Sequence, residues 1–123
     1  MKKKLMIVDD NLDLIYSVKR GLDDLASGYE FIEADSGEKC ISLLKKGQIP
    51  DLILLDIMMP DMDGWETAAQ IRSKLKWKKI PIIFLTAKTD EVSRGLGNVV
   101  SEDYIEKPFD TFDLKKRIDK VFK

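Results

Sequence analysis

The sequence predicts a doubly wound α/β domain, in which helices cover both faces of a five-stranded parallel sheet. Three observations lead to this prediction. The chain has 123 residues, the size of one ordinary domain, and 44% of them are hydrophobic, which is enough for a substantial core. Short apolar runs alternate with longer amphipathic segments along the whole chain. Several of these runs are continuous, as is typical of strands that are buried on both faces.

Five apolar runs are expected to form the strands of this sheet. Parallel neighbours need long crossover connections, and the segments between the runs are long enough to hold helices. A single domain with five strands and five helices, spanning residues 1–123, is therefore expected. The expected strands are Leu5–Val8, Tyr29–Ala34, Leu52–Leu55, Ile82–Leu85 and Tyr104–Ile105.

The helices are predicted from apolar residues that recur three or four positions apart. The first follows the N-cap Asn11, and the second begins at Ser36 and ends near Gly47. The third begins near residues 64–65, and the last begins at Asp110. The apolar positions of these four helices are, in turn, Leu12, Ile15, Val18, Leu22 and Leu25; Cys40, Ile41, Leu43 and Leu44; Ala68, Ala69, Ile71 and Leu75; and Phe112, Leu114, Ile118 and Val121.

The fourth helix has the weakest sequence pattern. Its segment contains Gly95, Gly97 and Asn98 in close succession, and each glycine inside a helix costs about 1 kcal/mol relative to alanine. We expect this helix to be short, ending near residues 94–96, or to be mobile.

Composition limits the chemistry that the protein can carry. The formal net charge of −1 and the lack of a long apolar run predict no direct binding to nucleic acid or membranes. Without histidine and with Cys40 as the single cysteine, a histidine-based triad, a histidine/cysteine zinc site and an internal disulfide are excluded. The run Leu5–Val8 is too short for the core of a signal peptide, so a cytoplasmic protein is expected. Trp77, within "KWKK", is expected at an exposed, charged helix end.

Polar side chains follow the expected strands at one end of the sheet. The first strand leads into Asp9 and Asp10, the third into Asp56, the fourth into Thr86, and the fifth leads to Lys107. Ligands of open α/β sheets bind at the carboxyl ends of the strands, so these five side chains are expected to converge.

The chemistry of this set favours phosphoryl transfer. Three neighbouring carboxylates repel one another, and a divalent cation removes that conflict. Mg²⁺ prefers oxygen ligands and commonly combines one or two carboxylates with phosphate oxygens. Lys107 and Thr86 could then stabilise a transferring phosphoryl group, with Asp56 as the nucleophile that forms an acyl phosphate.

Four motifs resemble those of one known family, the receiver domains of two-component response regulators. They are "IVDDN" (Ile7–Asn11), "LLDIMMPDMDG" (Leu54–Gly64), "PIIFLTAK" (Pro81–Lys88) and "DYIEKPF" (Asp103–Phe109). The resemblance covers essentially the whole chain. It implies a flavodoxin-like fold with strand order 2-1-3-4-5.

The resemblance also implies a role for each residue of the acidic end. Asp56 is expected to accept a phosphoryl group from the phosphohistidine of a sensor histidine kinase or of a phosphotransfer protein. Asp10 is expected to bind Mg²⁺ directly and Asp9 through a water molecule, and the backbone carbonyl of Met58 completes the metal site.

Signal output is the second implication of the resemblance. Thr86 and Lys107 are expected to contact the acyl phosphate, and Tyr104 is the expected switch aromatic, turning inward as Thr86 moves. The switch is expected to change the surface of the fourth helix, fifth strand and fifth helix for a downstream protein or an output domain. A homodimer that forms on phosphorylation, with Arg117 and Asp103 as charged positions, is a further expectation. The Lys107–Pro108 bond is expected to be cis.

Three alternatives remain beside this interpretation. A magnesium-dependent phosphohydrolase with an aspartyl nucleophile needs a second acid two residues after that nucleophile, where this chain has Met58. A flavin-binding electron carrier needs a phosphate loop after the first strand, where this chain has "DDNLDL". A degenerate receiver that serves only for docking would not need the intact acidic residues.

Met58 and Lys88 also predict slow loss of the phosphoryl group.

Overall fold

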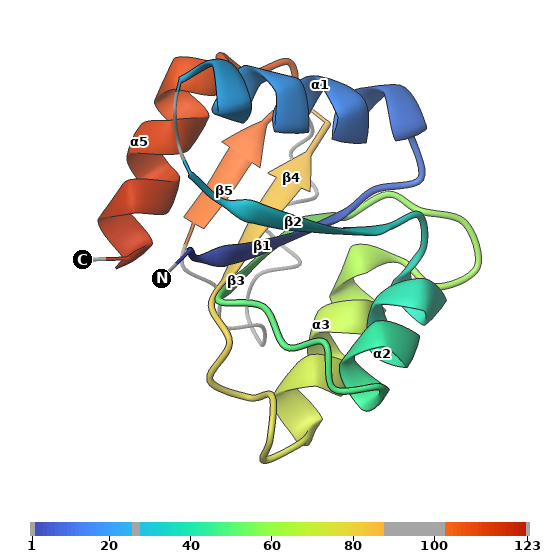
Figure 1. The fold of residues 1–123 in the computed structure, drawn as a ribbon. Helices are drawn as coiled ribbons and strands as arrows, with labels where there is room; N and C mark the ends of the chain where they lie inside the picture. Colours follow the sequence, from blue (N-terminus) through green and yellow to red (C-terminus); the bar gives the residue numbers. More distant parts are fainter. Residues whose placement is uncertain (1, 26–27, 88–102, 123) are drawn as a thin grey trace.

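The protein has the predicted parallel sheet. The computed structural model describes residues 2–25, 28–87 and 103–122 of the chain. All strand pairs are parallel, and the strand order is β2-β1-β3-β4-β5 (Figure 1). Each predicted strand is confirmed to within one residue at either end. The strands are β1 (Lys4–Val8), β2 (Glu30–Ala34), β3 (Leu52–Asp56), β4 (Ile82–Thr86) and β5 (Asp103–Glu106).

Helices cover both faces of the sheet. They are α1 (Leu12–Asp24), α2 (Gly37–Lys45), α3 (Gly64–Ser73) and α5 (Thr111–Phe122). Figure 1 shows α1 and α5 together on one face, with α2 and α3 on the other. The expected fourth helix falls within residues 88–102, which lie outside the described residues. No helix in the described ranges is both long enough and apolar enough to span a membrane.

Side-chain caps define where three of the helices begin. Asn11 accepts a hydrogen bond from the Leu14 N–H group, as predicted for this N-cap. Ser36, where the second helix was predicted to begin, is the N-cap of α2 and accepts a hydrogen bond from the Lys39 N–H group. At the third helix, Asp63 caps the Glu66 N–H group, so that α3 begins at Gly64.

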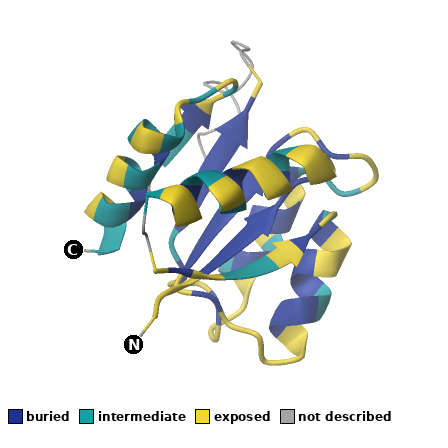
Figure 2. Cartoon of the chain, turned by 45° about the horizontal axis from the view of Figure 1, so that its top comes forward, coloured by how far each residue is buried: buried dark blue, intermediate teal, exposed yellow. Residues whose placement is uncertain are grey.

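The core consists of one apolar layer on each side of the sheet. Alternate residues of β1, β3 and β4 enter the two layers, so these strands are buried on both faces (Figure 2). The layer under α2 and α3 contains Phe84, and the layer under α1 and α5 contains Leu54. This two-sided burial is the physical reason for the continuous apolar runs in the sequence.

Some predicted apolar positions are wrong at the helix ends. Leu75 lies beyond the end of α3 and is 83% exposed, whereas Trp77, predicted to be exposed, is buried at 5% exposure. The backbone leaves the helical conformation at Lys74, so the residues that follow do not continue the helical periodicity used for the prediction. Leu12 and Phe112 lie in the first turns of α1 and α5 and are also exposed, as is Ala69 on the outer side of α3.

Candidate functional site

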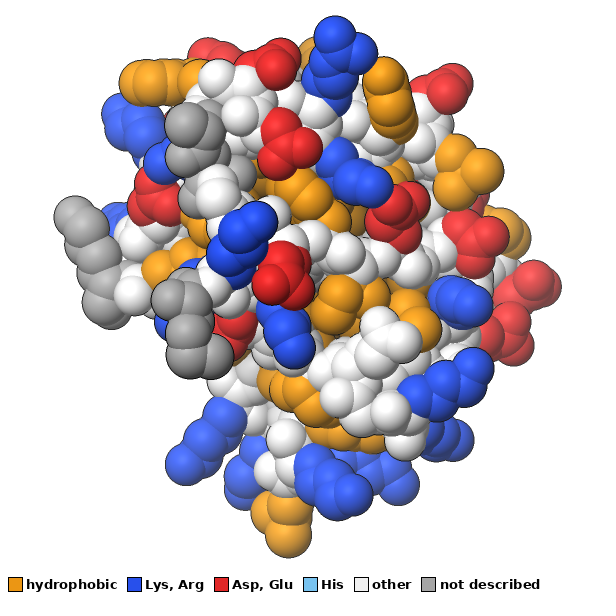
Figure 3. All heavy atoms as spheres, viewed as in Figure 1, with side chains coloured by type: hydrophobic (Ala, Val, Ile, Leu, Met, Phe, Trp, Pro, Cys, Tyr) orange, Lys and Arg blue, Asp and Glu red, His pale blue; other side chains and the backbone are white. Residues whose placement is uncertain are grey.

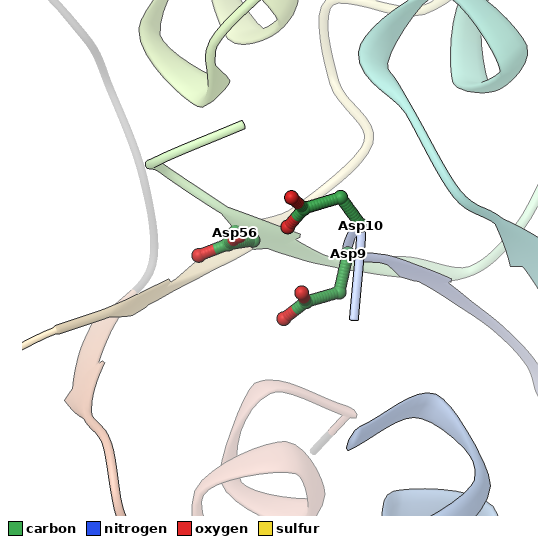
Figure 4. Close-up of side chains that lie close together, drawn as sticks. All are labelled: Asp9, Asp10 and Asp56. Atoms are coloured by element: carbon green, nitrogen blue, oxygen red, sulfur yellow. The ribbon is translucent and has the colours of Figure 1, made fainter. Parts of the chain in front are cut away.

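Three carboxylates meet at the carboxyl end of the sheet. Asp9 and Asp10 directly follow β1, and Asp56 is the last residue of the neighbouring strand β3. Each offers an oxygen, and these oxygens lie within 4.8 Å of one another. Figure 4 shows the side chains of Asp9 and Asp10 on either side of the end of β1, near Asp56. The predicted convergence of these residues is therefore observed.

One ammonium group links two of these carboxylates. Lys107 Nζ donates to Asp9 Oδ2 at 2.8 Å and to Asp56 Oδ1 at 3.1 Å. The lysine follows β5, and its backbone N–H group donates to the Thr86 carbonyl at 2.7 Å. Asp9 and Asp56 are buried, while Asp10 is exposed. The lysine therefore joins side chains from β1 and β3 at the point where both strands end.

The site carries more negative than positive charge. Burial, and after it the negative charge of Asp9, raise the pKa of Asp56 to about 6, although Lys107 opposes part of the rise. Burial alone would lower the pKa of the Lys107 ammonium, but its hydrogen bonds and ion pairs with Asp9 and Asp56 outweigh this effect and leave the pKa raised. One ammonium thus faces two buried carboxylates and a third at the surface.

This donor set fits a hard divalent cation. All three side chains offer carboxylate oxygens, which Mg²⁺ and Ca²⁺ prefer to nitrogen and sulfur ligands. Asp10 is open to solvent, while Asp9 and Asp56 are held in the interior. A cation here would also relieve the repulsion that raises the pKa of Asp56.

The loop after β3 is closed tightly against the strand end. Gly64 donates its N–H group to the Ile57 carbonyl at 2.7 Å, and a Cβ atom at position 64 would lie 2.3 Å from the backbone oxygen of Asp56. Only glycine allows this approach. Asp61 turns the loop with a φ of 67°, in the left-handed region. Met58 lies in this loop, and its side chain is exposed.

Thr86 lies at the same end of the sheet as the carboxylates. Asp56 pairs with Leu85 in the sheet, and Thr86 is the next and last residue of β4. Its buried hydroxyl donates to the Ala87 carbonyl at 2.8 Å. The Lys107–Pro108 bond is cis, as expected. Lys88 lies outside the described residues.

Tyr104 lies in an aromatic stack on β4. Its half-buried ring stacks on Phe84 at 5.4 Å between centroids, and Trp65 packs on Phe84 at 5.0 Å. Sequence analysis missed the role of Phe84, because its buried run indicates only a core strand. Arg117 pairs with Asp103 at 3.3 Å within the chain and donates to the Tyr104 carbonyl.

The sequence also matches a known family. Residues 5–119 match the family model of the response regulator receiver domain. The chain belongs to this family. Receiver domains act in two-component signalling, so the signalling interpretation of the sequence is confirmed at this level.

Curated relatives support the same assignment to the receiver family. The chain is 37% identical over 127 residues to the alkaline phosphatase synthesis transcriptional regulatory protein PhoP of Bacillus subtilis, covering 100% of this chain and 50% of that protein. It is 38% identical over 120 residues to the probable transcriptional regulator ycf27 of Cyanophora paradoxa, covering 95% of this chain and 47% of that one. This receiver domain spans about half the length of the curated relatives it matches.

Solved structures share the fold over almost the whole receiver domain. A putative response regulator from Chloroflexus aurantiacus superposes with a TM-score of 0.90 at 28% identity, covering 98% of each chain. The chemotaxis protein CheY4 of Vibrio cholerae superposes with a TM-score of 0.87 at 30% identity, covering 98% of this chain and 99% of that one. The flavodoxin-like fold is thereby confirmed.

Proposed function

We propose that the chain, over residues 1–123, is a receiver domain that accepts a phosphoryl group on Asp56. The donor is the phosphohistidine of a sensor histidine kinase or of a phosphotransfer protein. The observation that carries this proposal is the contact of Lys107 with both Asp9 and Asp56 beside the exposed Asp10. This contact supports the proposal because a carboxylate that could act as the nucleophile lies beside an ammonium and further carboxylate oxygens.

Mg²⁺ is the proposed cofactor of this reaction. Asp10 and Asp56 would bind it directly, Asp9 through a water molecule, and the backbone carbonyl of Met58 would complete the set. When bound, the ion supplies positive charge that neutralises the phosphoryl oxygens. The oxygen-only donor set and the excess of negative charge support this assignment.

Phosphoryl transfer needs Asp56 in its ionised form. An oxygen of this carboxylate attacks phosphorus; the new O–P bond forms as the N–P bond to the donor imidazole breaks, and the bonding electron pair leaves with the imidazole nitrogen. Lys107 is already within hydrogen-bond distance of Asp56, so its ammonium group can donate a hydrogen bond to a phosphoryl oxygen once the group is attached. The pairing of Asp9 with the same ammonium keeps Lys107 near the reacting atoms.

Output begins with a change of hydrogen bond at Thr86. Its hydroxyl donates to the Ala87 carbonyl before phosphorylation and would turn to a phosphoryl oxygen afterwards. That movement opens space beside β4, into which the ring of Tyr104 can turn from its stack on Phe84. The surface of the fourth helix, β5 and α5 would thereby change for a downstream protein or an output domain.

The proposed reaction is stoichiometric and needs no turnover of phosphate esters. The apolar Met58 stands where an aspartyl phosphohydrolase would need an acid to protonate a leaving group. Its exposed side chain offers no proton. We therefore propose self-phosphorylation and slow self-dephosphorylation as the only chemistry of the domain.

The test is labelling by a small phosphodonor. The purified protein is incubated with acetyl phosphate and Mg²⁺, and intact mass spectrometry measures the gain of one phosphoryl group. Asp56→Asn should show no gain, whereas Asp61→Asn, at an exposed position of the same loop, should label like the wild type. A chelator should abolish labelling. An Asp56→Asn protein that is labelled as fast as the wild type would disprove the assignment.

A further inference from the structure

A second charged surface lies at the opposite end of the sheet from Asp56. It is formed by the end of α2 and by the segment between α3 and β4, and Figure 3 shows Lys and Arg side chains gathered at this lower end of the molecule. We call it the lysine surface. Its members are Lys45, Lys46, Lys74, Lys76, Lys78 and Lys79, all of them exposed.

The segment that carries four of these lysines is held in a defined shape. Trp77 is buried in the layer under α2 and α3 and anchors the segment from inside. Arg72 donates to the carbonyls of Lys78 at 3.1 Å and Ile80 at 2.8 Å. The Lys74 carbonyl accepts from the N–H groups of Trp77 and Lys78 at 3.0 and 2.9 Å. The lysine backbones are therefore positioned in advance of any binding.

The positive charge of this surface is not balanced by ion pairs within the part of the chain that the structure describes. None of the six lysines forms an ion pair with another residue in the ranges 2–25, 28–87 and 103–122. Neither 45–50 nor 74–81 contains an acidic residue, and Asp51, the next acid along the chain, accepts a hydrogen bond from the Lys4 N–H group. A chain with a net charge of −1 thus concentrates six positive charges at one end.

An apolar hollow lies in the middle of these charges. Its volume is about 540 Å³, and its walls include Leu44, Leu75 and Trp77 together with Lys45, Lys74 and Lys76. A hollow of this size is large enough for one or two apolar side chains. Leu75 is 83% exposed beside it, although the segment around it is well anchored. The surface thus combines an apolar centre with a cationic rim.

We propose that the lysine surface binds an acidic segment of a partner protein. Carboxylates of that segment would pair with the lysines, and an apolar side chain between them would enter the hollow against Leu75. The lysines favour a partner segment with negative charge, and the apolar hollow favours a segment that also carries an apolar side chain.

Nucleic acid and membranes fit this surface less well. Trp77, the only aromatic residue in 44–50 and 73–81, is buried and cannot stack on bases, and Arg72 is engaged with backbone carbonyls. A flat bilayer would leave the hollow unfilled, and within 45–50 and 74–81 the large apolar side chains exposed for insertion are Ile49 and Leu75 alone. A protein segment uses both the rim and the hollow.

The position of the surface has a functional consequence. The lysine surface lies at the amino ends of the strands, whereas Asp56 ends β3 at their carboxyl ends. A partner can therefore be held there while Asp56 exchanges its phosphoryl group. Binding at this surface is expected to be independent of phosphorylation.

The experiment uses a synthetic peptide of alternating glutamate and leucine and the isotope-labelled protein. Nuclear magnetic resonance shifts should concentrate at residues 44–46 and 73–79, and raised salt should weaken binding. The double variant Lys74→Glu/Lys76→Glu should lose affinity by about tenfold or more, since each change replaces an attraction by a repulsion. Lys116→Glu/Lys120→Glu on α5 has the same net charge and should bind like the wild type.

The same titration separates the alternatives. A peptide of alternating glutamate and serine should bind more weakly, because it leaves the hollow empty. Equal losses in the two double variants, or shifts centred on residues 9–10 and 56, would overturn the proposal. Tighter binding of single-stranded DNA or of phosphatidylserine vesicles than of the glutamate–leucine peptide would overturn it in favour of those partners. If Lys74→Glu/Lys76→Glu does not fold, the shift map and salt dependence of the wild type still decide.

Discussion

Removing the charge of Asp56 should stabilise the ion-free protein. Burial and the charge of Asp9 raise the pKa of Asp56 from 3.8 to about 6, so the folded state favours the protonated carboxyl. One pKa unit corresponds to about 1.4 kcal/mol, and the shift of about two units therefore corresponds to about 3 kcal/mol. Asp56→Asn supplies a neutral side chain of similar shape and should recover up to that amount at pH 7.5.

The sign of this effect can be followed with pH. Because the folded-state pKa is raised, the contribution of Asp56 to the free energy of unfolding is fully present below the unfolded pKa of about 4. This contribution is lost as the pH rises through the folded-state pKa of about 6. The advantage of Asp56→Asn in the free energy of unfolding should therefore grow between pH 4 and pH 6 and stay constant above. Mg²⁺ should stabilise the wild type more than Asp56→Asn and thereby reduce the difference in the free energy of unfolding between them.

Urea denaturation in a chelating buffer at pH 5 and pH 7.5 measures the stability gain of Asp56→Asn and its change with pH. Asp61→Asn, an exposed aspartate with a left-handed backbone that asparagine tolerates, serves as the control and should change stability little at either pH. The reasoning fails if Asp56→Asn is no more stable than the wild type at pH 7.5. It also fails if the gain at pH 5 equals that at pH 7.5.

Three other predictions follow from the same contacts. Met58→Asn should shorten the lifetime of the acyl phosphate several-fold in a pulse-chase, because an amide can orient water where the exposed methionine cannot; an unchanged lifetime would contradict this. Gly64→Ala should cost about 1–3 kcal/mol and slow phosphoryl labelling, since its Cβ would lie 2.3 Å from the Asp56 backbone oxygen; normal labelling would show that the loop can relax. The pKa of Tyr29 is raised by burial and then by its hydrogen bond to Asp119. The contribution of its hydroxyl group to the free energy of unfolding should therefore be fully present below pH 10 and decrease progressively above it. Tyr29→Phe should therefore be less stable by about 1 kcal/mol at pH 7 and lose less stability between pH 10 and pH 12 in denaturation experiments.

The strands and the acidic end could be predicted from sequence for a simple physical reason. Continuous apolar runs such as Leu52–Leu55 are buried on both faces of the sheet, as central strands of a parallel sheet require. The rule that ligands bind at the carboxyl ends of such strands then places Asp9, Asp10 and Asp56 together.

Other features depend on contacts that no local pattern encodes. Lys107 is 98 residues from Asp9 and 51 from Asp56, and its motif does not reveal that it bridges both. Trp77 and Leu75 exchange their predicted exposure because α3 ends at Ser73, and this end depends on how the following segment packs. Helix ends are the least predictable points of an element for this reason.

One tryptophan lies in helix α3 and a second lies in the segment that follows it. Trp65 lies in the first turn of α3 and packs on Phe84 in the same aromatic stack as Tyr104, while Trp77 lies four positions after Ser73, beneath the lysine surface. The domain thus contains two tryptophan fluorophores, one for each end of the molecule. Replacing either by phenylalanine isolates the emission of the other, so that phosphorylation and partner docking can be recorded as separate optical signals without any attached dye.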